Sequence, residues 1–187
     1  MYIMQWNARS IKNKKEELTK YLVDHNIQIA AITETWLAEP DLFHISGYNI
    51  IRNDREDGKG GICFLIQNKL PYDIVQIHTN EDLSKTQYIK IRIFNMTLIN
   101  IYNPPPNKIC RNYWGQIILD CQEPYLIMGD FNIHHTVWST HSSKDGQMLL
   151  EVIESTNTFC LNNGAPTHIS YNTMSTPDIT MFSQIIV

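Results

Sequence analysis

The chain has 187 residues, of which 43% are hydrophobic and 18% charged, and its formal net charge is −4. These values are typical of a globular protein, and the length is sufficient for one domain, residues 1–187, with a substantial core. They exclude a membrane-spanning helix, because no run approaches the roughly 18 consecutive apolar residues that a span needs. The N-terminus also lacks the pattern of a targeting or export signal, so we expect an intracellular protein.

The cysteines are widely spaced and form no Cys-x-x-Cys or Cys/His zinc pattern. They are Cys63, Cys110, Cys121 and Cys160. This spacing favours buried, reduced thiols, which agrees with an intracellular protein.

Charge is distributed unevenly along the chain. Residues 1–111 hold 14 Lys and Arg against 12 Asp and Glu, a net charge of +2. Residues 112–187 hold one Lys against seven Asp and Glu, a net charge of −6. The acidic half is either a solvated surface or a set of carboxylates gathered around a cation.

Short apolar runs rich in Ile, Tyr and Thr predict strands, and apolar residues at helical spacing predict helices. In chain order these elements are a strand at 2–6, a helix at 14–24, strands at 27–33, 62–67, 87–94 and 96–102, a helix at 112–120, a strand at 124–128, a helix at 145–153 and a strand at 179–187. Strands mixed with a few helices predict an α/β fold. We expect a four-layer α/β sandwich, in which two mixed β-sheets pack face to face and helices flank them.

Polar residues lie where four of the predicted strands end. They are Asn7, Glu34, Tyr102 and, within the tetrapeptide Gly129-Asp130-Phe131-Asn132, both Asp130 and Asn132. Strand ends at one rim of a sheet can position functional groups rigidly. The four strand ends together therefore predict an active site at that rim.

These side chains together suit hydrolysis of a phosphodiester. Glu34 offers a carboxylate to Mg²⁺ or Mn²⁺, which prefer oxygen ligands. Asp130 either activates a water as general base or binds a second cation. The amides of Asn7 and Asn132 orient ligands or a phosphoryl oxygen, and Tyr102 donates a hydrogen bond to phosphate. The set predicts in-line attack by water, with the metal stabilising the charge that develops.

Each of these residues alone has a simpler explanation. A single Glu after an apolar run is usually a solvated strand end, and a Tyr before three prolines is typical of a core or turn residue. Gly-Asp-Phe-Asn by itself is typical of a β-turn. The occurrence of the whole set, in one order and at successive strand ends, favours the catalytic interpretation.

The order Asn7, Glu34, Tyr102, Asp130-x-Asn132 and Ser175-Thr176-Pro177-Asp178 resembles the endonuclease/exonuclease/phosphatase superfamily. Within it, the chain is similar to the endonuclease domain of jockey-type non-LTR retrotransposons. The segments that carry this second resemblance are Gln5-Trp6-Asn7-Ala8-Arg9-Ser10, Thr33-Glu34-Thr35-Trp36-Leu37, Arg52-Asn53-Asp54-Arg55 with Gly60-Gly61, Tyr102-Asn103-Pro104-Pro105, residues 129–138, residues 162–167 and Pro177-Asp178.

The resemblance implies a role for each matching residue. Glu34 is implied to be the metal ligand, with Asn7 beside it. Asp130 is implied to activate or align the attacking water, which Asn132 orients. In the same way, Tyr102 is implied to contact the scissile phosphate. The resemblance gives Asp178 the role of orienting a catalytic histidine further along the chain.

Further residues are candidates for contacts with DNA. We expect Arg9 to contact DNA phosphates together with the lysines that follow it, which are Lys12, Lys14 and Lys15. His134 follows the family pattern, and two interpretations of it stay open, contact with DNA or a role in loop structure. We expect His168 to be an ordinary surface or structural residue.

One element of the family is not found in the sequence. Relatives end their catalytic series with Ser-Asp-His on a last strand, and no Ser-Asp-His occurs in residues 1–187. We therefore expect a C-terminally truncated domain that lacks its last strand and has an unpaired sheet edge. We also expect weak catalysis or none, because loss of such a group raises the barrier by about 4 kcal/mol or more.

The leading interpretation is a DNA endonuclease that nicks one strand with Mg²⁺, or with Mn²⁺ in its place. As a monomer in the nucleus, it would leave a 3′-hydroxyl that primes reverse transcription. The reverse transcriptase that the resemblance implies in the same polyprotein is absent from this chain. The alternative is an inactive retroelement remnant that only binds nucleic acid or a partner. A phosphatase acting on lipid or inositol phosphates is disfavoured, because no basic pocket for a headgroup can be recognised.

Overall fold

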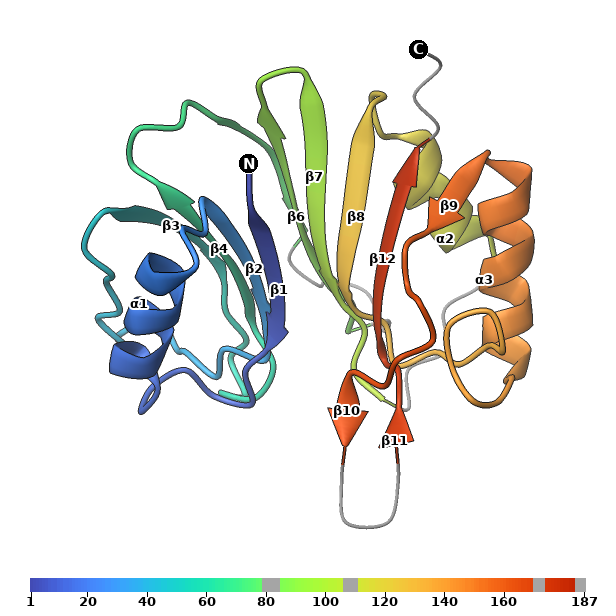
Figure 1. Cartoon of the computed structure of the whole chain (residues 1–187), viewed down its shortest axis with the longest axis horizontal. Helices are drawn as coiled ribbons and strands as arrows, with labels where there is room; N and C mark the ends of the chain where they lie inside the picture. Colours follow the sequence, from blue (N-terminus) through green and yellow to red (C-terminus); the bar gives the residue numbers. More distant parts are fainter. Residues whose placement is uncertain (79–84, 106–110, 170–173, 184–187) are drawn as a thin grey trace.

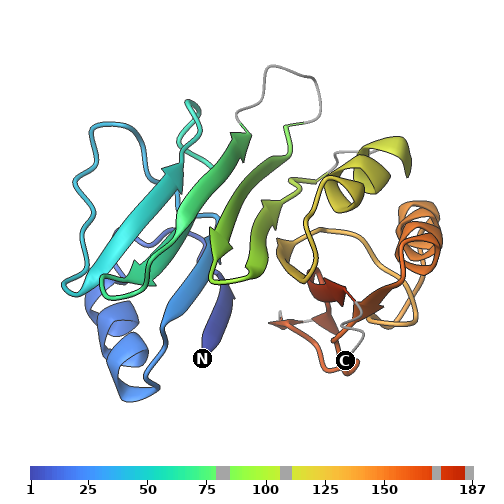
Figure 2. The same ribbon diagram turned by 90° about the horizontal axis from the view of Figure 1, so that it is seen from above.

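The protein consists of two mixed β-sheets packed face to face, with helices on their outer faces (Figure 1). The computed structural model describes residues 1–78, 85–105, 111–169 and 174–183. Helix α1 lies outside the first sheet, and α2 and α3 lie outside the second, so that in the view from above they occupy opposite sides of the molecule (Figure 2). The predicted four-layer α/β sandwich is confirmed.

The first sheet has the strand order β1-β2-β4-β3. Its strands are β1 (Ile3–Asn7), β2 (Ile29–Thr33), β3 (Tyr48–Asn53) and β4 (Ile62–Gln67). β1 and β2 run parallel, and α1 (Lys15–Asp24) lies in the crossover between them, as a parallel pair requires. Leu18 and Leu22 of α1 are buried in the cluster that this helix forms with the first sheet.

The second sheet has the strand order β5-β6-β7-β8-β12-β9. Its strands are β5 (Asp73–His78), β6 (Gln87–Ile93), β7 (Met96–Tyr102), β8 (Tyr125–Asp130), β9 (Thr158–Cys160) and β12 (Asp178–Ser183). β7 and β8 run parallel, with α2 (Arg111–Leu119) between them in the chain, whereas β12 runs antiparallel to β8. The remaining elements are α3 (Lys144–Ser155) and the short antiparallel pair β10 (His168–Ile169) and β11 (Met174–Ser175).

Packing on both faces explains why β2 is apolar along nearly its whole length. All five of its residues are buried. Ala30 and Ile32 belong to the core cluster beneath α1, whereas Ile29 and Ala31 belong to the cluster between the two sheets. Because successive side chains of a strand point to opposite faces, a strand covered on both faces needs apolar residues at successive positions.

The predicted strands and helices are all present, with bounds that differ by a few residues. Residues 184–187 of the last predicted strand lie outside the described residues. The sequence pattern missed β3, in which polar residues interrupt the apolar ones, and β5, an edge strand with five exposed residues out of six. It also missed β9, β10 and β11, which are only two or three residues long. A strand without a continuously buried face does not produce the apolar run on which the prediction rests.

The first sheet ends at β1, whose other side pairs with no strand within the described part of the chain. All five residues of β1 are half-buried. Cys63, Cys121 and Cys160 are free thiols, and Cys110 lies outside the described residues. None of the helices that the structure describes is both long enough and apolar enough to cross a membrane.

Gly129 lies where β7 and β8 approach each other closely. It pairs with Ile101 in the parallel register, and its φ is +151°. A Cβ atom at this position would lie 1.8 Å from the main-chain oxygen of Ile101, so no larger residue fits. Backbone packing, rather than chemistry, therefore requires the first residue of Gly-Asp-Phe-Asn.

We predict that Gly129→Ala prevents the protein from reaching its folded state, because the clash involves backbone that cannot move without breaking the sheet. Gly115 in α2 is the matched control, since nothing lies within 4 Å of a Cβ placed there. Gly115→Ala should raise the free energy of unfolding by about 0.5–1 kcal/mol, the advantage of alanine over glycine in a helix. Urea unfolding followed by circular dichroism measures both variants. A Gly129→Ala protein as stable as the wild type would contradict the packing argument.

Candidate active site

Four strands bring polar side chains to one rim of the sandwich. Asn7 ends β1, Glu34 follows β2 and Asp130 ends β8, so these three residues lie at the carboxyl ends of their strands. Asp178 begins β12. Because β12 runs antiparallel to β8, the first residue of β12 lies beside the last residue of β8, and the register pairs Asp178 with Asp130.

A cleft of about 500 Å³ opens at this rim. The predicted site residues in its lining are Asn7, Arg9, Glu34, Asp130, Asn132, His134 and Asp178. The other lining residues are Gln5, Trp6, Pro105, Asn162, Thr167, His168, Ser175, Pro177 and Thr180. The structure therefore brings together residues from both ends of the chain, and it also places His168, expected to be an ordinary residue, in the cleft.

Tyr102 is the predicted site residue that does not lie in this lining. Its side chain is only 6% exposed. Burial raises the pKa of its hydroxyl well above the usual range, and the nearby carboxylates of Glu34 and Asp130 raise it further. Tyr102 thus lies close to the two acids, but beneath the surface of the cleft.

The side chain of Asn7 joins carboxylates that belong to different sheets. Its Nδ2 donates to Oε1 of Glu34 at 2.9 Å and to Oδ2 of Asp130 at 2.6 Å. An amide nitrogen carries two hydrogens, so it can make both bonds at once. One amide therefore holds Glu34 and Asp130 on either side of itself.

Asp130 is a buried acid, with 2% of its surface exposed. Burial raises the pKa of its carboxyl to about 7, with further increases from the carboxylates of Asp178 and Glu34, whereas hydrogen bonds from Asn7 and Asn132 lower it. Burial also raises the pKa of Asp178. Negative charge is therefore crowded in the cleft, and a bound cation would relieve that crowding.

The donor atoms of the cleft fit a hard divalent cation. Among the residues that the structure describes, no three His, Cys, Asp or Glu side chains form a complete set of metal ligands. Mg²⁺, however, commonly binds proteins through one or two carboxylates and keeps several of its waters. Glu34 supplies such a carboxylate, and the amide of Asn7 lies beside it.

Gln5 is a cleft residue outside the set of site residues that the sequence predicts. Its Nε2 donates to the main-chain oxygen of Gly129 at 2.9 Å and to Oδ1 of Asp178 at 3.3 Å. Its Oε1 accepts a hydrogen bond from Thr180 at 2.9 Å. Gln5 precedes Asn7 by two residues on β1, so both side chains point to the same face. That spacing was the signal available in the sequence.

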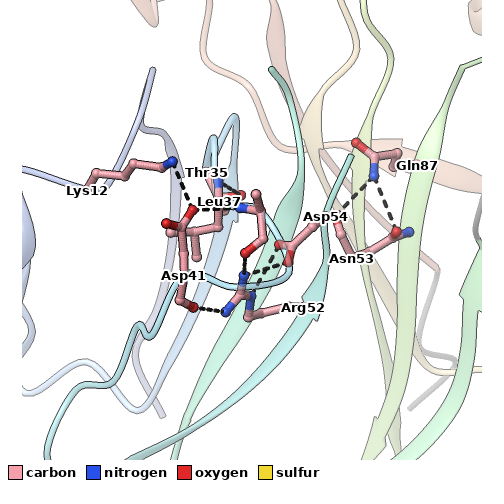
Figure 3. Close-up of polar contacts among 9 residues, drawn as sticks. Lys12, Thr35, Leu37, Asp41, Arg52, Asn53, Asp54 and Gln87 are labelled. Atoms are coloured by element: carbon pink, nitrogen blue, oxygen red, sulfur yellow. Dashed lines mark hydrogen bonds and ion pairs between the residues drawn. The ribbon is translucent and has the colours of Figure 1, made fainter. Parts of the chain in front are cut away.

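A polar network supports the loop between β2 and β3 (Figure 3). Arg52 donates to the main-chain oxygens of Asp41 and Ala38, each at 2.8 Å, and forms an ion pair with Asp54 at 2.5 Å. The carboxylate of Asp41 pairs with Lys12 at 2.8 Å. These contacts give the segment Arg52-Asn53-Asp54-Arg55 a structural explanation, since they connect β3 with the loops that follow β1 and β2.

Gln87 on β6 bonds to Asn53, the neighbour of Arg52 in the chain (Figure 3), and it is linked through Gly61 to the residue after Glu34. Nε2 of Gln87 donates to the main-chain oxygen of Asn53 at 3.0 Å, and its Oε1 accepts from the N–H of Gly61 at 2.9 Å. The main-chain oxygen of Gly61 then accepts from the N–H of Thr35 at 3.1 Å. The backbone at Glu34, whose φ is +53°, is therefore anchored on the second sheet.

The basic residues near Asn7 differ in what they contact. Lys12 forms the ion pair with Asp41, and Lys14 donates to the main-chain oxygen of Ala8 and lies over the ring of Trp6. These contacts occupy two of the lysines expected to bind DNA phosphates. Arg9, in contrast, lines the cleft with an exposed side chain.

His134 lines the cleft next to the turn that contains Asp130 and Asn132. Its Nδ1 lies 3.3 Å from the hydroxyl of Ser139, and its ring lies against that of His141, with 4.4 Å between centroids. Burial lowers the pKa of His134, and the neighbouring His141 lowers it further. The imidazole therefore combines a loop contact with a position in the cleft.

The chain is similar in sequence to proteins of retrotransposons. The family described as "Endonuclease-reverse transcriptase" matches residues 96–187. The "RNA-directed DNA polymerase from mobile element jockey" of Drosophila melanogaster is 28% identical over 176 residues, which are 92% of this chain and 19% of that protein. The "Probable RNA-directed DNA polymerase from transposon BS" of the same species is 25% identical over 97% of this chain and 21% of its own length. The chain thus spans about a fifth of the length of these curated relatives.

Solved structures share the fold. The "Endonuclease domain of TRAS1, a telomere-specific non-LTR retrotransposon" superposes with a TM-score of 0.73 at 21% identity, over 96% of this chain and 83% of that one. An AP endonuclease from Archaeoglobus fulgidus superposes with a TM-score of 0.74 at 15% identity, over 98% of this chain and 87% of that one. At these identities the superpositions establish the architecture alone.

The chain is therefore similar to proteins of the endonuclease/exonuclease/phosphatase superfamily, through the family model that matches residues 96–187 and through the shared fold. Within that superfamily the chain is jockey-like, similar to the endonuclease domains of non-LTR retrotransposons. Both statements agree with the resemblance found in the sequence.

The raised pKa of Asp130 predicts how stability depends on pH. The carboxyl of Asp130 binds its proton more tightly in the folded protein than in the unfolded chain. The free energy of unfolding therefore decreases as the pH rises from the unfolded pKa near 4 to the folded pKa of about 7. In the absence of metal we therefore expect the melting temperature to fall between about pH 4 and about pH 7.

Asp130→Asn removes this titration, so it should raise the melting temperature at about pH 8 by at least roughly 3 °C and flatten the pH dependence. Differential scanning calorimetry in EDTA measures the effect. Asp73→Asn, at the exposed start of β5, is the control and should leave the profile unchanged. A melting temperature of Asp130→Asn at or below that of the wild type at the higher pH would contradict the crowding of charge.

Proposed function

We propose that this chain is a DNA endonuclease domain that uses Mg²⁺, or Mn²⁺, to nick one strand by in-line attack of water. The observation that carries the proposal is the pair of hydrogen bonds by which Asn7 joins Glu34 of the first sheet to Asp130 of the second. This arrangement places an oxygen ligand for a cation beside a buried acid with a raised pKa. The nuclease-type relatives support DNA as the substrate.

Five residues of the cleft have distinct parts in the proposed reaction. Glu34, with Asn7 beside it, holds the cation, which when bound stabilises negative charge on the phosphoryl oxygens. Asp130 accepts the proton of the attacking water, because its buried carboxyl shares the amide of Asn7 with the metal ligand Glu34. Asn132 orients that water, and Arg9 contacts a DNA phosphate at the mouth of the cleft.

Asp178 is held in place by two amides. Gln5 donates to its carboxylate, and Nδ2 of Asn162 donates to its main-chain oxygen at 2.9 Å. The family role of this aspartate is to orient an imidazole, which there comes from Ser-Asp-His. We therefore propose that the polypeptide of residues 1–187, when expressed alone, nicks DNA slowly. The nick would offer a 3′-hydroxyl to a reverse transcriptase acting as partner.

The proposal predicts Mg²⁺-dependent nicking of supercoiled plasmid. A segment carrying Ser-Asp-His, added after residue 187, should raise the rate by about 100-fold or more, because a group that stabilises the transition state is worth that much. Asp130→Ala and Glu34→Gln should each remove this gain, whereas Asp73→Ala on the exposed strand β5 should not. Gel electrophoresis of open-circular and supercoiled plasmid measures every rate.

Two outcomes would count against this function. Robust nicking by residues 1–187 alone would refute the expected impairment, though not the nuclease itself. If the extended polypeptide does not nick, the nuclease proposal fails. Duplex DNA binding that weakens with salt and with Arg9→Ala would then identify a remnant that only binds nucleic acid.

A further inference from the structure

Asn103 is a buried residue that the proposed reaction does not use. It follows the last residue of β7 and is only 1% exposed. Its main-chain N–H donates to the main-chain oxygen of Asp130 at 2.8 Å, and its Nδ2 donates to that of Phe131 at 2.8 Å. Its main-chain oxygen accepts from Nδ2 of Asn132 at 3.0 Å. One residue therefore contacts every residue of the turn 130–132.

The turn 130–132 needs such contacts to keep its shape. Asn132 has a φ of +51°, in the left-handed region that L residues occupy at a cost. Within the turn, the N–H of Asn132 donates to Oδ1 of Asp130 at 3.2 Å. This single internal bond closes the turn, and the bonds to Asn103 fix it against β7.

The contact with Asn103 also determines which way the amide of Asn132 lies. A main-chain oxygen can only accept, so the nitrogen of the Asn132 amide must face Asn103. Its Oδ1 then points away from Asn103, and it accepts no hydrogen bond from any residue in the described part of the chain. Because Asn132 lines the cleft, this oxygen is an acceptor for a hydrogen of the attacking water.

Thr86 determines the orientation of Asn103 in turn. Its hydroxyl donates to Oδ1 of Asn103 at 3.3 Å, and its side chain is fully buried. A donor on one side of the Asn103 amide leaves the NH₂ group to face the main-chain oxygen of Phe131. The chain of contacts thus runs from Thr86 through Asn103 to the turn that carries Asp130 and Asn132.

We propose that Asn103 is a positioning residue: it holds the turn 130–132 so that Asn132 presents a hydrogen-bond acceptor to the attacking water. Asn103 does not touch the substrate and acts through Asn132 and Asp130. The inference rests on the proposed hydrolysis and adds to it the group that orients the water-binding amide.

Asn100 provides a matched contrast on the same strand. It is fully buried, and its Nδ2 donates to the main-chain oxygens of Ile32 at 3.0 Å and Cys63 at 2.9 Å. These bonds join β7 to the facing sheet and do not reach the turn 130–132. Asn100 and Asn103 therefore agree in burial and in type of hydrogen bond, but only Asn103 holds residues of the cleft.

Hydrogen exchange at Asn132, followed by NMR, tests the proposal without requiring activity. Asn103→Leu should speed exchange of the Asn132 main-chain N–H by at least about tenfold, because it removes the bond to Phe131. Asn100→Leu should leave that rate unchanged even if it lowers overall stability. Where Asn103→Leu does not fold, Thr86→Val should speed the same exchange and Thr86→Ser, which keeps the hydroxyl, should restore it. Equal exchange in Asn103→Leu and wild type, or in Thr86→Val and Thr86→Ser, would overturn the proposal.

Nicking kinetics then test whether the held turn matters for the reaction. Asn103→Leu should lower kcat by about 10- to 100-fold while KM for DNA changes by less than about threefold, as expected when a supporting contact is lost. A loss confined to KM, or an equal loss in Asn100→Leu, would overturn the positioning role. If the polypeptide extended with Ser-Asp-His does not exceed its own Asp130→Ala variant in rate, the proposed nuclease fails. The exchange data would still decide whether Asn103 fixes the turn.

Discussion

The hydrogen bond from Asn7 to Asp130 is the contact on which the whole site depends, because it joins the two sheets at their rim. Each sheet is rigid in itself, but the relative placement of the two comes from packing between them. Ile29 and Ala31 of the first sheet belong to the cluster that fills this interface, and Asn100 adds hydrogen bonds across it. The packing of the core between the two sheets therefore determines how accurately the side chains of the cleft are placed relative to one another.

Burial of Asp130, the acceptor in this contact, raises the pKa of its carboxyl. An exposed Asp130 would ionise as an ordinary acid, but an Asp130 enclosed beside Asp178 and Glu34 holds its proton to about neutral pH. Neutral amides reduce this cost, because Asn7 donates to Asp130 and Gln5 donates to Asp178. Amides stabilise carboxylates without neutralising them, so the net negative charge that would attract a divalent cation is preserved.

The strand-end residues could be predicted from the sequence because apolar runs locate strands and the polar residue after each run is visible. That reasoning identified Asn7, Glu34, Asp130 and Asn132, which line one cleft. Resemblance to a family, not spacing, identified Asp178. The position of Tyr102 beneath the cleft could not be predicted, since a strand end does not reveal which face its side chain takes.

The supporting amides of Gln5 and Asn103 could not be predicted from local sequence patterns, for a different reason. Gln5 and Asp178 are 173 positions apart in the chain, and Asn103 and Phe131 are 28 apart. A buried amide inside or beside an apolar strand gives no sign of its partner until the fold is known. The strands β3 and β5 were missed for a related reason, because neither has a continuously buried apolar face.

The antiparallel pairing of β12 with β8 makes strand register a condition for chemistry as well as for folding. Asp178 faces Asp130 only in the observed alignment. A slip of β12 by one residue would turn Asp178 to the opposite face of the sheet and bring Ile179 to the rim. A change that shifts β12 along β8 can therefore remove a carboxylate from the site even though Asp178 itself is unaltered.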